Sequence, residues 1–459
     1  MQEQVLPRYS TISIAPPRYI APSSLSSTAQ GHYSFPLLNS KGKTWASVNL
    51  RKDIHRRAPS GANDVPIIEE GANPMTGTVN LELQSPETIQ GITLVVRGRA
   101  VTGANEGGSQ TFLDHSVFSW SKGQDDPHIY RTDLDNIGNS STGSKTGKLS
   151  GRYRFPFSIS LPMADAAGST LPETFLERTS GVRVQYELVL KIGRGRLKAD
   201  SKLRIPILYR RKTTPSAASE LRQLAYRENT PAPGPGLDPY GWSTFDAVDC
   251  IGRLLNSRTV ILRCTLSLAS PLSYTRGSFI PCHLRIESVD EQALDFLASP
   301  RTTILNLSRR VKYLFDAGQG MQHNGKSKAS RPKYEISDVS QASWTQDQDQ
   351  DVNENNSRVR CLTGEIPLSK ELPPSSDVLS FGVEYAVALL PFESVTFLPE
   401  RAALLQTHKV EIVTEYAPGP VPASCRASVD HIGASWVASA VDSGNTIAAS
   451  HNNPFQLVT

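Results

Sequence analysis

The sequence predicts an all-β protein built from two consecutive antiparallel β-sandwich domains with disordered termini. Several segments alternate apolar and polar residues with a period of two, and segments with the period of a helix are nearly absent. The chain also contains 32 glycines and 32 prolines, the residues that separate short strands. Alternation places one face of each strand on a core and the other in water. A chain of 459 residues is long enough for two domains of ordinary size.

The first sandwich is predicted from four alternating segments. Their apolar positions are Val79, Leu81 and Leu83; Ile92, Leu94 and Val96; Tyr153, Phe155, Phe157, Ile159 and Leu161; and Val182, Val184, Tyr186, Leu188 and Leu190. Residues 1–32, in contrast, are polar, rich in serine and proline and without any period, which is typical of disorder. We therefore expect a disordered tail over residues 1–32 and the first sandwich over residues 33–209.

A basic and then proline-rich stretch predicts the connection between the two domains. It starts at Arg210, Arg211 and Lys212 and continues through the closely spaced prolines of residues 231–235. Such a change of composition is typical of a domain boundary. We place the linker over residues 210–255 and expect a short helix in it over Ser216–Arg227.

The second sandwich is predicted over residues 256–416, where alternation resumes. Its apolar positions are Val260, Leu262, Cys264, Leu266 and Leu268; Cys282, Leu284 and Ile286; Val383, Tyr385, Val387 and Leu389; and Val410 and Ile412. Residues 321–357 are acidic and rich in glutamine, so they bury too little apolar surface to fold, and we predict a disordered loop there. The tail over residues 417–459 is small and polar and is also predicted to be disordered.

Composition argues against several function classes. A formal net charge of +4 is small for this length, whereas a nucleic-acid-binding protein carries a concentrated basic face. The five cysteines lie far apart without the spacing of metal ligands, which favours reduced thiols in the cytosol. The N-terminus lacks the apolar core of a signal peptide, and no apolar run reaches the ~18–20 residues that cross a membrane. We therefore expect a cytoplasmic protein whose membrane association is peripheral.

The sequence offers no candidate catalytic residue, metal ligand or cofactor site. HExxH, GxSxG, CxxC and glycine-rich phosphate-loop motifs are all absent. Among the nine histidines, His55 and His128 lie in polar stretches, and His283 falls on the polar side of a predicted strand. We therefore expect a protein that binds other proteins and is not an enzyme.

Two motifs near the N-terminus match the ligand pattern of WW domains, [Leu/Pro]-Pro-x-Tyr. They are Leu6-Pro7-Arg8-Tyr9 and Pro16-Pro17-Arg18-Tyr19. Proline fixes φ near the polyproline II value, so the segment loses little entropy when it docks in an aromatic groove. We predict that Leu6, Pro7 and Tyr9 form one WW-binding site and that Pro16, Pro17 and Tyr19 form another. The alternative, a proline-rich tail with no partner, is open at this point.

Several segments, taken in order, resemble the arrestin family. In the first half these are Thr76–Leu83 with Ile89–Gly98, the run Phe155–Pro162 followed by Leu171-Pro172-Glu173-Thr174-Phe175, and Val182–Ile192. In the second half they are Tyr274–Pro281, Cys361–Pro367 with Leu372-Pro373-Pro374-Ser375, and Val383–Leu389. The resemblance covers roughly residues 33–415 and is greatest to the α-arrestin branch (arrestin-related trafficking adaptors) of fungi. It departs from the family pattern at Thr174, where serine is usual, and in having its [Leu/Pro]-Pro-x-Tyr motifs before the body.

The resemblance implies a fold of immunoglobulin-like, arrestin-type sandwiches and an adaptor function. Such adaptors bring a WW-domain HECT-type ubiquitin ligase to the cytosolic tails of membrane transporters or receptors, which promotes ubiquitination and endocytosis. The expected location is the cytoplasm, with transient recruitment to the plasma membrane or endosomes. An arrestin-fold scaffold for vesicle sorting or signalling, without ligase recruitment, is the alternative. We could not identify in this sequence the buried charged cluster that holds visual arrestins and β-arrestins inactive.

Three further segments are weaker candidates. Arg194, Arg196 and Lys198 form a basic run that could bind phosphate groups on a cargo tail or an anionic membrane, although the solvated face of an edge strand is the favoured interpretation. Asn453-Pro454-Phe455 matches the tripeptide bound by endocytic EH domains. The run Arg210–Thr214 has the pattern of a site for an arginine-directed kinase in the linker.

The two WW-binding motifs are predicted to differ in strength. Pro16–Tyr19 carries a double proline and is therefore better preorganised than Leu6–Tyr9. We expect Tyr19→Ala to weaken binding of a WW-domain ligase more than Tyr9→Ala in a quantitative pull-down. Equal losses from the two substitutions would contradict this ranking.

Overall fold

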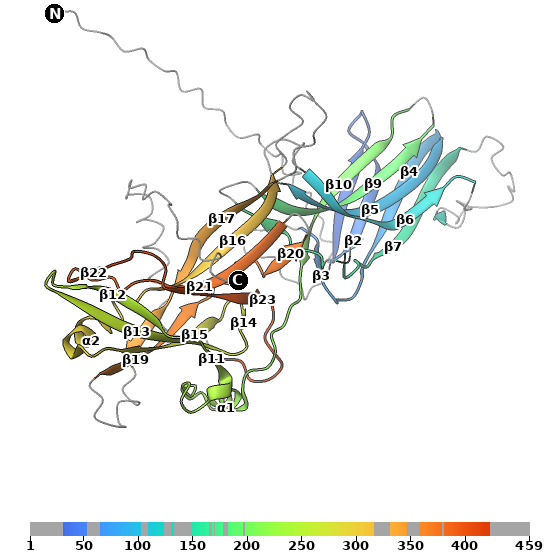
Figure 1. The fold of residues 1–459 in the computed structure, drawn as a ribbon. Helices are drawn as coiled ribbons and strands as arrows, with labels where there is room; N and C mark the ends of the chain where they lie inside the picture. Colours follow the sequence, from blue (N-terminus) through green and yellow to red (C-terminus); the bar gives the residue numbers. More distant parts are fainter. Residues whose placement is uncertain are drawn as a thin grey trace, which may run out of the picture.

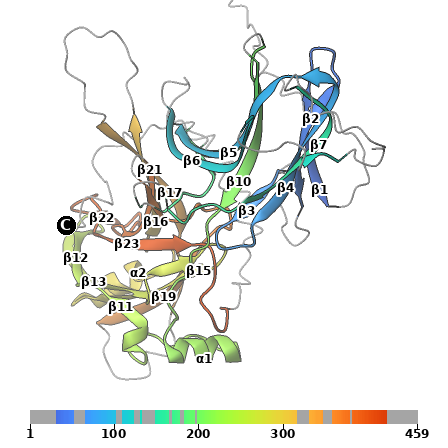
Figure 2. The same cartoon turned by 90° about the vertical axis from the view of Figure 1, so that its right-hand side faces the viewer.

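Two β-sandwiches lie end to end in the computed structural model, and both are elongated along the same general direction (Figure 1). The structure describes residues 31–52, 65–101, 109–123, 130–132, 148–164, 168, 170–177, 182–195, 198–315, 331–346, 358–378 and 381–422. Seen at right angles to the first view, the two layers of each sandwich separate clearly (Figure 2). The predicted fold class, all-β with two antiparallel sandwiches, is confirmed.

The first sandwich packs a four-stranded sheet, in the order β1-β2-β4-β7, on a sheet in the order β3-β10-β9-β5-β6, with β8 added beside β9. Its strands are β1 (His32–Leu38), β2 (Thr44–Arg51), β3 (Ile67–Glu69), β4 (Met75–Glu87), β5 (Ile89–Val101), β6 (Ser109–Ser121), β7 (Leu149–Ile159), β8 (Phe175–Leu176), β9 (Arg183–Arg194) and β10 (Ser201–Arg210). Neighbouring strands are antiparallel except β3, which runs parallel to the end of β10.

The second sandwich repeats this layout. One sheet has the order β18-β19-β15-β13-β12-β22 with β11 beside β13, and the other has the order β14-β23-β21-β16-β17 with β20 beside β21. The strands are β11 (Trp242–Thr244), β12 (Val248–Leu254), β13 (Arg258–Ala269), β14 (Ser273–Thr275), β15 (Phe279–Glu287), β16 (Leu305–Phe315), β17 (Arg331–Gln341), β18 (Ser343–Gln346), β19 (Val359–Pro367), β20 (Ser376–Val378), β21 (Phe381–Leu389), β22 (Phe397–Pro399) and β23 (Gln406–Val413). Again one short strand, β14, runs parallel to the last strand, β23.

The two cores consist of the alternating residues that the sequence indicated. In the first sandwich, Val79 and Leu81 of β4 and Phe155 of β7 are fully buried against Leu94 and Leu188 of the facing sheet. All the apolar positions predicted for both sandwiches are buried, apart from Leu161, which is half-buried. Burial of each such side chain stabilises a fold by roughly 1.5–3 kcal/mol, so this pattern alone specifies which face of each strand is inside.

A hydrogen-bonded corner closes each sandwich, and it is built the same way twice. In the first, the Tyr186 hydroxyl donates to the Pro172 carbonyl at 2.6 Å. Thr174 then joins the end of β10: its N–H donates to the Tyr209 carbonyl at 3.0 Å, and its Oγ1 accepts from the Tyr209 N–H at 2.8 Å. The corner thus satisfies backbone groups that the sheet edge would leave unpaired.

The second sandwich has the same corner at the equivalent positions. The Tyr385 hydroxyl donates to the Pro373 carbonyl at 2.7 Å. The Ser375 N–H donates to the Ile412 carbonyl at 2.8 Å, and its Oγ accepts from the Ile412 N–H at 2.9 Å. The two Leu-Pro-x-Thr/Ser motifs are therefore one structural device used in both domains.

Helix α1 (Glu220–Glu228) anchors the linker to the second sandwich. It begins after Ser219, whose side chain caps it, and ends at Asn229 in the left-handed conformation, so it starts later than predicted. Arg222 is buried and donates to the carbonyls of Ser270 at 2.9 Å and Gly241 at 2.6 Å. Its guanidinium also lies 5.0 Å from the centre of the Trp242 ring. The second helix, α2 (Glu291–Leu297), fills the connection between β15 and β16.

Two expectations about the second sandwich need correction. Strands β11 and β12 lie within the predicted linker, so the second sandwich begins at Trp242 and not at residue 256. The alternation in β12 is obscured by Gly252, which is needed because an added Cβ would lie 2.3 Å from the Phe397 ring.

His283 was predicted on the polar side of its strand, yet it is buried. The centroids of the His283 and Trp242 rings are 6.4 Å apart.

The predicted disordered loop over residues 321–357 was wrong for its middle part. Residues 331–346 form β17 and β18, whereas residues 316–330 and 347–357 lie outside the described part of the chain. Strand β17 is an edge strand that pairs with β16 along its whole length, from Arg331 to Gln341. An edge strand needs little apolar surface because one neighbour supplies its hydrogen bonds, and polar side chains protect its open side.

We expect Tyr186→Phe and Tyr385→Phe each to lower the free energy of unfolding by about 1–2 kcal/mol. Each leaves a proline carbonyl of the corner without its donor, that of Pro172 buried and that of Pro373 partly buried. Urea denaturation followed by tryptophan fluorescence measures this. Tyr334→Phe is the matched control: Tyr334 is 49% exposed and would keep its ring beneath Arg310, so a change within about 0.5 kcal/mol is expected. Equal stability of all three variants would contradict a structural role for the corner.

Candidate functional site at the interdomain joint

The segment that carries the first corner also carries the contact between the domains. Pro172 and Thr174 bind their own sandwich, as described above, and the residues between and after them point the other way. Because side chains alternate along an extended chain, Glu173, Phe175 and Glu177 share one face. We call these three residues the interdomain stripe, since each of them contacts the second sandwich.

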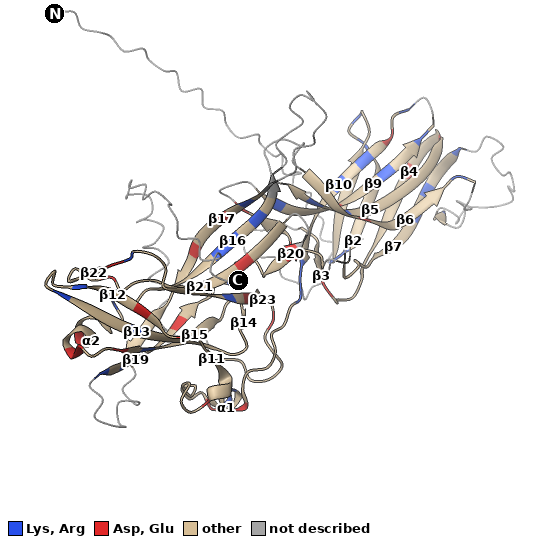
Figure 3. Cartoon of the chain, viewed as in Figure 1, with Lys and Arg blue, Asp and Glu red and all other residues tan. Residues whose placement is uncertain are grey.

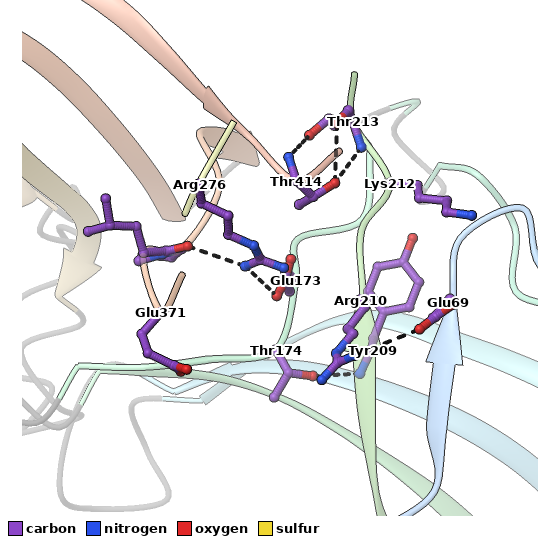
Figure 4. Close-up of polar contacts among 12 residues, drawn as sticks. Glu69, Glu173, Thr174, Tyr209, Arg210, Lys212, Thr213, Arg276, Glu371 and Thr414 are labelled. Carbon is purple, nitrogen blue, oxygen red and sulfur yellow. Dashed lines mark hydrogen bonds and ion pairs between the residues drawn. The ribbon is translucent and has the colours of Figure 1, made fainter. Parts of the chain in front are cut away.

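Each member of the interdomain stripe has its own partner. Glu173 Oε1 lies 3.0 Å from Arg276 Nη1, in the turn after β14, as Figure 4 shows. The Phe175 ring packs on the Phe381 ring at the start of β21, with centroids 5.2 Å apart. Glu177 pairs with Arg309 of β16. Two ion pairs thus flank one aromatic contact across the joint.

The charges of the stripe are largely removed from water. The side chains of Glu173 and Arg276 are 14% and 19% exposed, and those of Glu177 and Arg309 are 11% and 16% exposed. Burial raises the pKa of Glu173 above its ordinary value, and the nearby Arg276 guanidinium only partly offsets this effect. Buried pairs of this kind contribute little net stability, but separating one member from the other is costly. The main effect of the stripe is therefore to fix the position of one domain relative to the other.

Arg276 is itself held in place by the second sandwich. Besides Glu173, its Nη1 donates to the Leu372 carbonyl at 3.2 Å, beside the second corner (Figure 4). The two Leu-Pro motifs therefore meet at this guanidinium, one through a carboxylate and one through a backbone carbonyl. Arg309 and its neighbour Arg310 divide their roles: Arg309 crosses the joint, while Arg310 pairs with Glu384 inside its own sheet. Figure 3 shows these basic bands on β16 next to the acidic band of β21.

The start of the linker is fastened to both domains. Arg210 Nη1 lies 3.8 Å from Glu69 Oε1, and the Lys212 N–H donates to the Glu70 carboxylate at 3.0 Å, both in the first sandwich. One residue later, Thr213 is bound to Thr414, just after β23 of the second sandwich (Figure 4). The linker therefore passes through the joint as part of its hydrogen-bonded structure.

A polar depression lies on the open face of the sheet β1-β2-β4-β7, with a volume of about 800 Å³. Hydroxyl and amide side chains line its floor, among them Ser34, Asn49 and Asn80. Arg51 and Arg154 add positive charge, and no acidic residue is among the lining residues. Such a surface suits an extended segment that carries hydrogen-bonding and negative groups.

The residues predicted as sites fall in different places. The WW-binding motifs over residues 6–19, the Asn-Pro-Phe tripeptide over residues 453–455, and Arg196 all lie outside the described residues. Arg194 stacks over the Trp45 ring at 4.2 Å, and Lys198 lies 3.5 Å from Glu87, so both have partners within the first sandwich. The two described members of the basic run, Arg194 and Lys198, therefore already have partners, and its phosphate-binding role has no further support.

The interdomain ion pairs were missed by reasoning from the sequence. Glu173 and Arg276 stood in two segments whose likeness to the arrestin family was noted, yet 103 residues separate them along the chain. The available signal was the pattern Glu173-x-Phe175-x-Glu177, which places acids and an aromatic ring on one face of a short strand. That pattern indicates a strand face that belongs neither to a hydrophobic core nor to an ordinary solvent-exposed surface.

Within the part of the chain that the structure describes, no group of three or more histidine, cysteine or acidic side chains could hold a metal ion. Over the same residues, no helix is long and apolar enough to cross a membrane. The described cysteines, Cys250, Cys264, Cys282 and Cys361, are free thiols.

Comparisons with known proteins give one type of match. No family model and no curated protein matches this chain. Among solved structures that match is the crystal structure of squid arrestin, with 11% sequence identity and a TM-score of 0.32; the match covers 85% of this chain and all of that one.

We expect Arg276→Gln to lower the free energy of unfolding by roughly 2–4 kcal/mol near neutral pH, because Glu173 is left buried without its charged partner. Without Arg276, the pKa of Glu173 rises further above the ordinary 4.5. A carboxyl group whose pKa is raised by folding destabilises the fold when it is ionised. The loss of stability should therefore shrink as the pH falls toward 4.5. Denaturation curves at several pH values measure this.

The double variant Glu173→Gln/Arg276→Gln is the control for that prediction. It removes both charges and leaves two groups that can hydrogen-bond, so it should recover most of the stability and lose the pH dependence. A single variant as stable as the parent at neutral pH would show that the pair does not bridge the domains in solution.

Proposed function

We propose that this chain is an arrestin-type adaptor of the α-arrestin branch that recruits a WW-domain HECT-type ubiquitin ligase to membrane cargo. The observation that carries the proposal is the joining of two [Leu/Pro]-Pro-x-Tyr motifs to a body of two β-sandwiches. The ligase performs the chemistry, and the adaptor supplies one surface for the ligase and another for the cargo. Ubiquitination of the cargo then leads to its endocytosis.

The position of the motifs relative to the body supports ligase delivery. Tyr19 precedes Gly31, the first described residue, by 12 residues. A segment of that length spans at most ~40 Å when fully extended, which is about the size of one small domain. A ligase held at Tyr19 is therefore confined near β1, the edge strand of the first sandwich.

The cargo half of the proposal is supported by the polar depression. It lies on the same sheet as β1, so a segment bound there would lie within reach of the tethered ligase. Its basic and hydrogen-bonding lining favours acidic cytosolic tails of transporters or receptors. Confinement of ligase and target in one volume raises their effective concentration without new contacts.

The joint gives this arrangement a defined geometry. With the interdomain stripe in contact with Arg276, Phe381 and Arg309, the second sandwich is held at one orientation to the first. Cargo that also touches the second sandwich would then meet a surface of constant shape, and would bind with a smaller loss of entropy.

The deciding experiment is a pull-down of the full-length chain with isolated WW domains of a HECT-type ligase. We expect wild type to bind and a Tyr9→Ala/Tyr19→Ala double variant to lose binding by about tenfold or more, because each tyrosine fills the second pocket of its WW domain. Ubiquitin transfer to a membrane cargo in the same cells should fall in parallel.

The matched control is Tyr33→Ala, which removes an aromatic side chain close to the motifs but within β1. It should bind WW domains as wild type does. If wild type itself binds no WW domain, ligase recruitment fails, and an arrestin-fold scaffold for vesicle sorting or signalling becomes the better explanation.

A further inference from the structure

We propose that Thr213 is a phosphorylation site for an arginine-directed protein kinase, and that its clamp to Thr414 controls access to it. The clamp comprises the hydrogen bonds between Thr213 and residues Thr414 and Glu415. Gating of Thr213 does not require the WW-domain partner, because every residue involved lies in the two-sandwich body. Phosphorylation of Thr213 would regulate the joint between the domains, independently of ligase recruitment.

The local sequence has the chemistry that such kinases recognise. Arg210 and Arg211 precede Thr213 by three and two residues. Arginine at these positions pairs with carboxylates in the substrate groove of a basophilic kinase, and its planar fork makes two hydrogen bonds at once. Thr214, the next hydroxyl, is exposed and followed by Pro215, whereas Thr213 is half-buried. Thr213, and not Thr214, is thus the residue whose exposure changes when the linker is released from the second sandwich.

The clamp is unusually dense for a linker. The Thr213 N–H donates to Thr414 Oγ1 at 2.8 Å, and Thr414 Oγ1 in turn donates to the Thr213 carbonyl at 3.2 Å. The same carbonyl accepts the N–H groups of Thr414 at 3.1 Å and Glu415 at 2.9 Å. Thr213 Oγ1, the atom that would receive phosphate, accepts the Thr414 N–H at 3.2 Å. All of these bonds are lost if the segment is drawn into a kinase groove.

The recognition arginines are also occupied while the clamp is closed. Arg210 lies beside Glu69, and Arg211 Nη1 is 3.5 Å from the Ser375 carbonyl of the second corner. A kinase must therefore displace partners from both domains before it can read the segment. At the same time, Arg211 Nε is buried without a hydrogen-bond partner among the described residues, which weakens the closed state. The clamp is a contact that can open.

Phosphorylation would then keep the clamp open. Thr213 Oγ1 attacks the γ-phosphorus of ATP, the bond to the β,γ-bridging oxygen breaks, ADP leaves, and the hydroxyl proton passes to the base of the kinase. The phosphate brings about two negative charges and three further oxygens to Thr213 Oγ1, the atom that accepts the Thr414 N–H in the clamp. The bulk of the group at that N–H opposes reclosure.

Release of Thr414 would also free the segment that follows it. Tyr416, Pro418, Pro420 and Pro422 line a small cavity of about 90 Å³ together with Arg222 of α1. The segment after Thr414 therefore lies over the linker helix as well as the linker start. Opening of the clamp loosens the joint at the linker, whereas the Glu173–Arg276 and Glu177–Arg309 ion pairs involve neither Thr213 nor Thr414.

The test measures the initial rate of Thr213 phosphorylation in the intact, folded chain, using an arginine-directed kinase with Mg-ATP and site mapping by mass spectrometry. Thr414→Val removes Oγ1, which is both acceptor and donor in the clamp, and should raise the rate about fivefold or more. Thr414→Ser keeps the hydroxyl and should react at the wild-type rate. Thr407→Val, on the same final strand β23, removes a buried hydroxyl that has no partner in the described structure and should also match wild type.

Two further measurements decide the outcome. A synthetic peptide of residues 207–218 should react faster than the intact protein, because it has no clamp. In the phosphorylated protein, hydrogen exchange at the amides of Thr414 and Glu415 should accelerate, since their acceptor is Thr213. Equal rates for wild type and Thr414→Val, phosphate only on Thr214, or no phosphate on Thr213 even in the peptide would each overturn the proposal, as would unchanged exchange after phosphorylation.

Discussion

The contact of the interdomain stripe with the second sandwich is the constraint on which the arrangement of the two domains depends. Glu173 and Glu177 are carboxylates taken largely out of water, and each needs the one guanidinium that faces it. A rotation of one domain would leave these charges buried and unpaired, which costs more than the contact gains. The aromatic contact between Phe175 and Phe381 buries apolar area at the joint, but it does not require one fixed orientation of the domains. Electrostatics therefore sets the interdomain angle, and apolar burial stabilises it.

The two sandwiches are built alike and differ where they meet. Both use a Leu-Pro-x-Thr/Ser corner, yet the variable position is Glu173 in the first and Pro374 in the second. The turn after the short parallel strand likewise starts with Glu70 in the first domain and Arg276 in the second. Glu70 accepts the N–H of Lys212 in the linker, whereas Arg276 donates to Glu173 across the joint. The two equivalent positions thus carry opposite charges, and the one in the second domain contacts the first domain.

The joint also explains how one chain can combine a stable body with a site that responds to a signal. The stripe consists of two largely buried ion pairs and an aromatic contact, whereas the linker clamp consists of neutral hydrogen bonds. Neutral bonds of this kind contribute about 1 kcal/mol each and are lost one segment at a time. The domains can therefore loosen at the linker before the stripe separates. Such loosening would change the relative placement of the domains without unfolding either sandwich.

The sequence by itself determined the fold class and the inward-facing residues of the strands it identified, because alternation with a period of two shows which face of a strand is inside. It was misleading where that signal is diluted: at β12, where Gly252 makes room for Phe397, and at β17, an edge strand that needs few apolar residues. The predicted WW-binding motifs rest on the sequence alone, since a linear ligand carries its chemistry in consecutive residues.

Only the tertiary structure decided which charges meet. Glu173 and Arg276 are 103 residues apart, and Thr213 and Thr414 are 201 apart. No local pattern encodes such a pairing, because it depends on how two completed sandwiches dock. In the sequence these residues belong to separate motifs and a basic run, whereas in the folded protein they lie together at the joint.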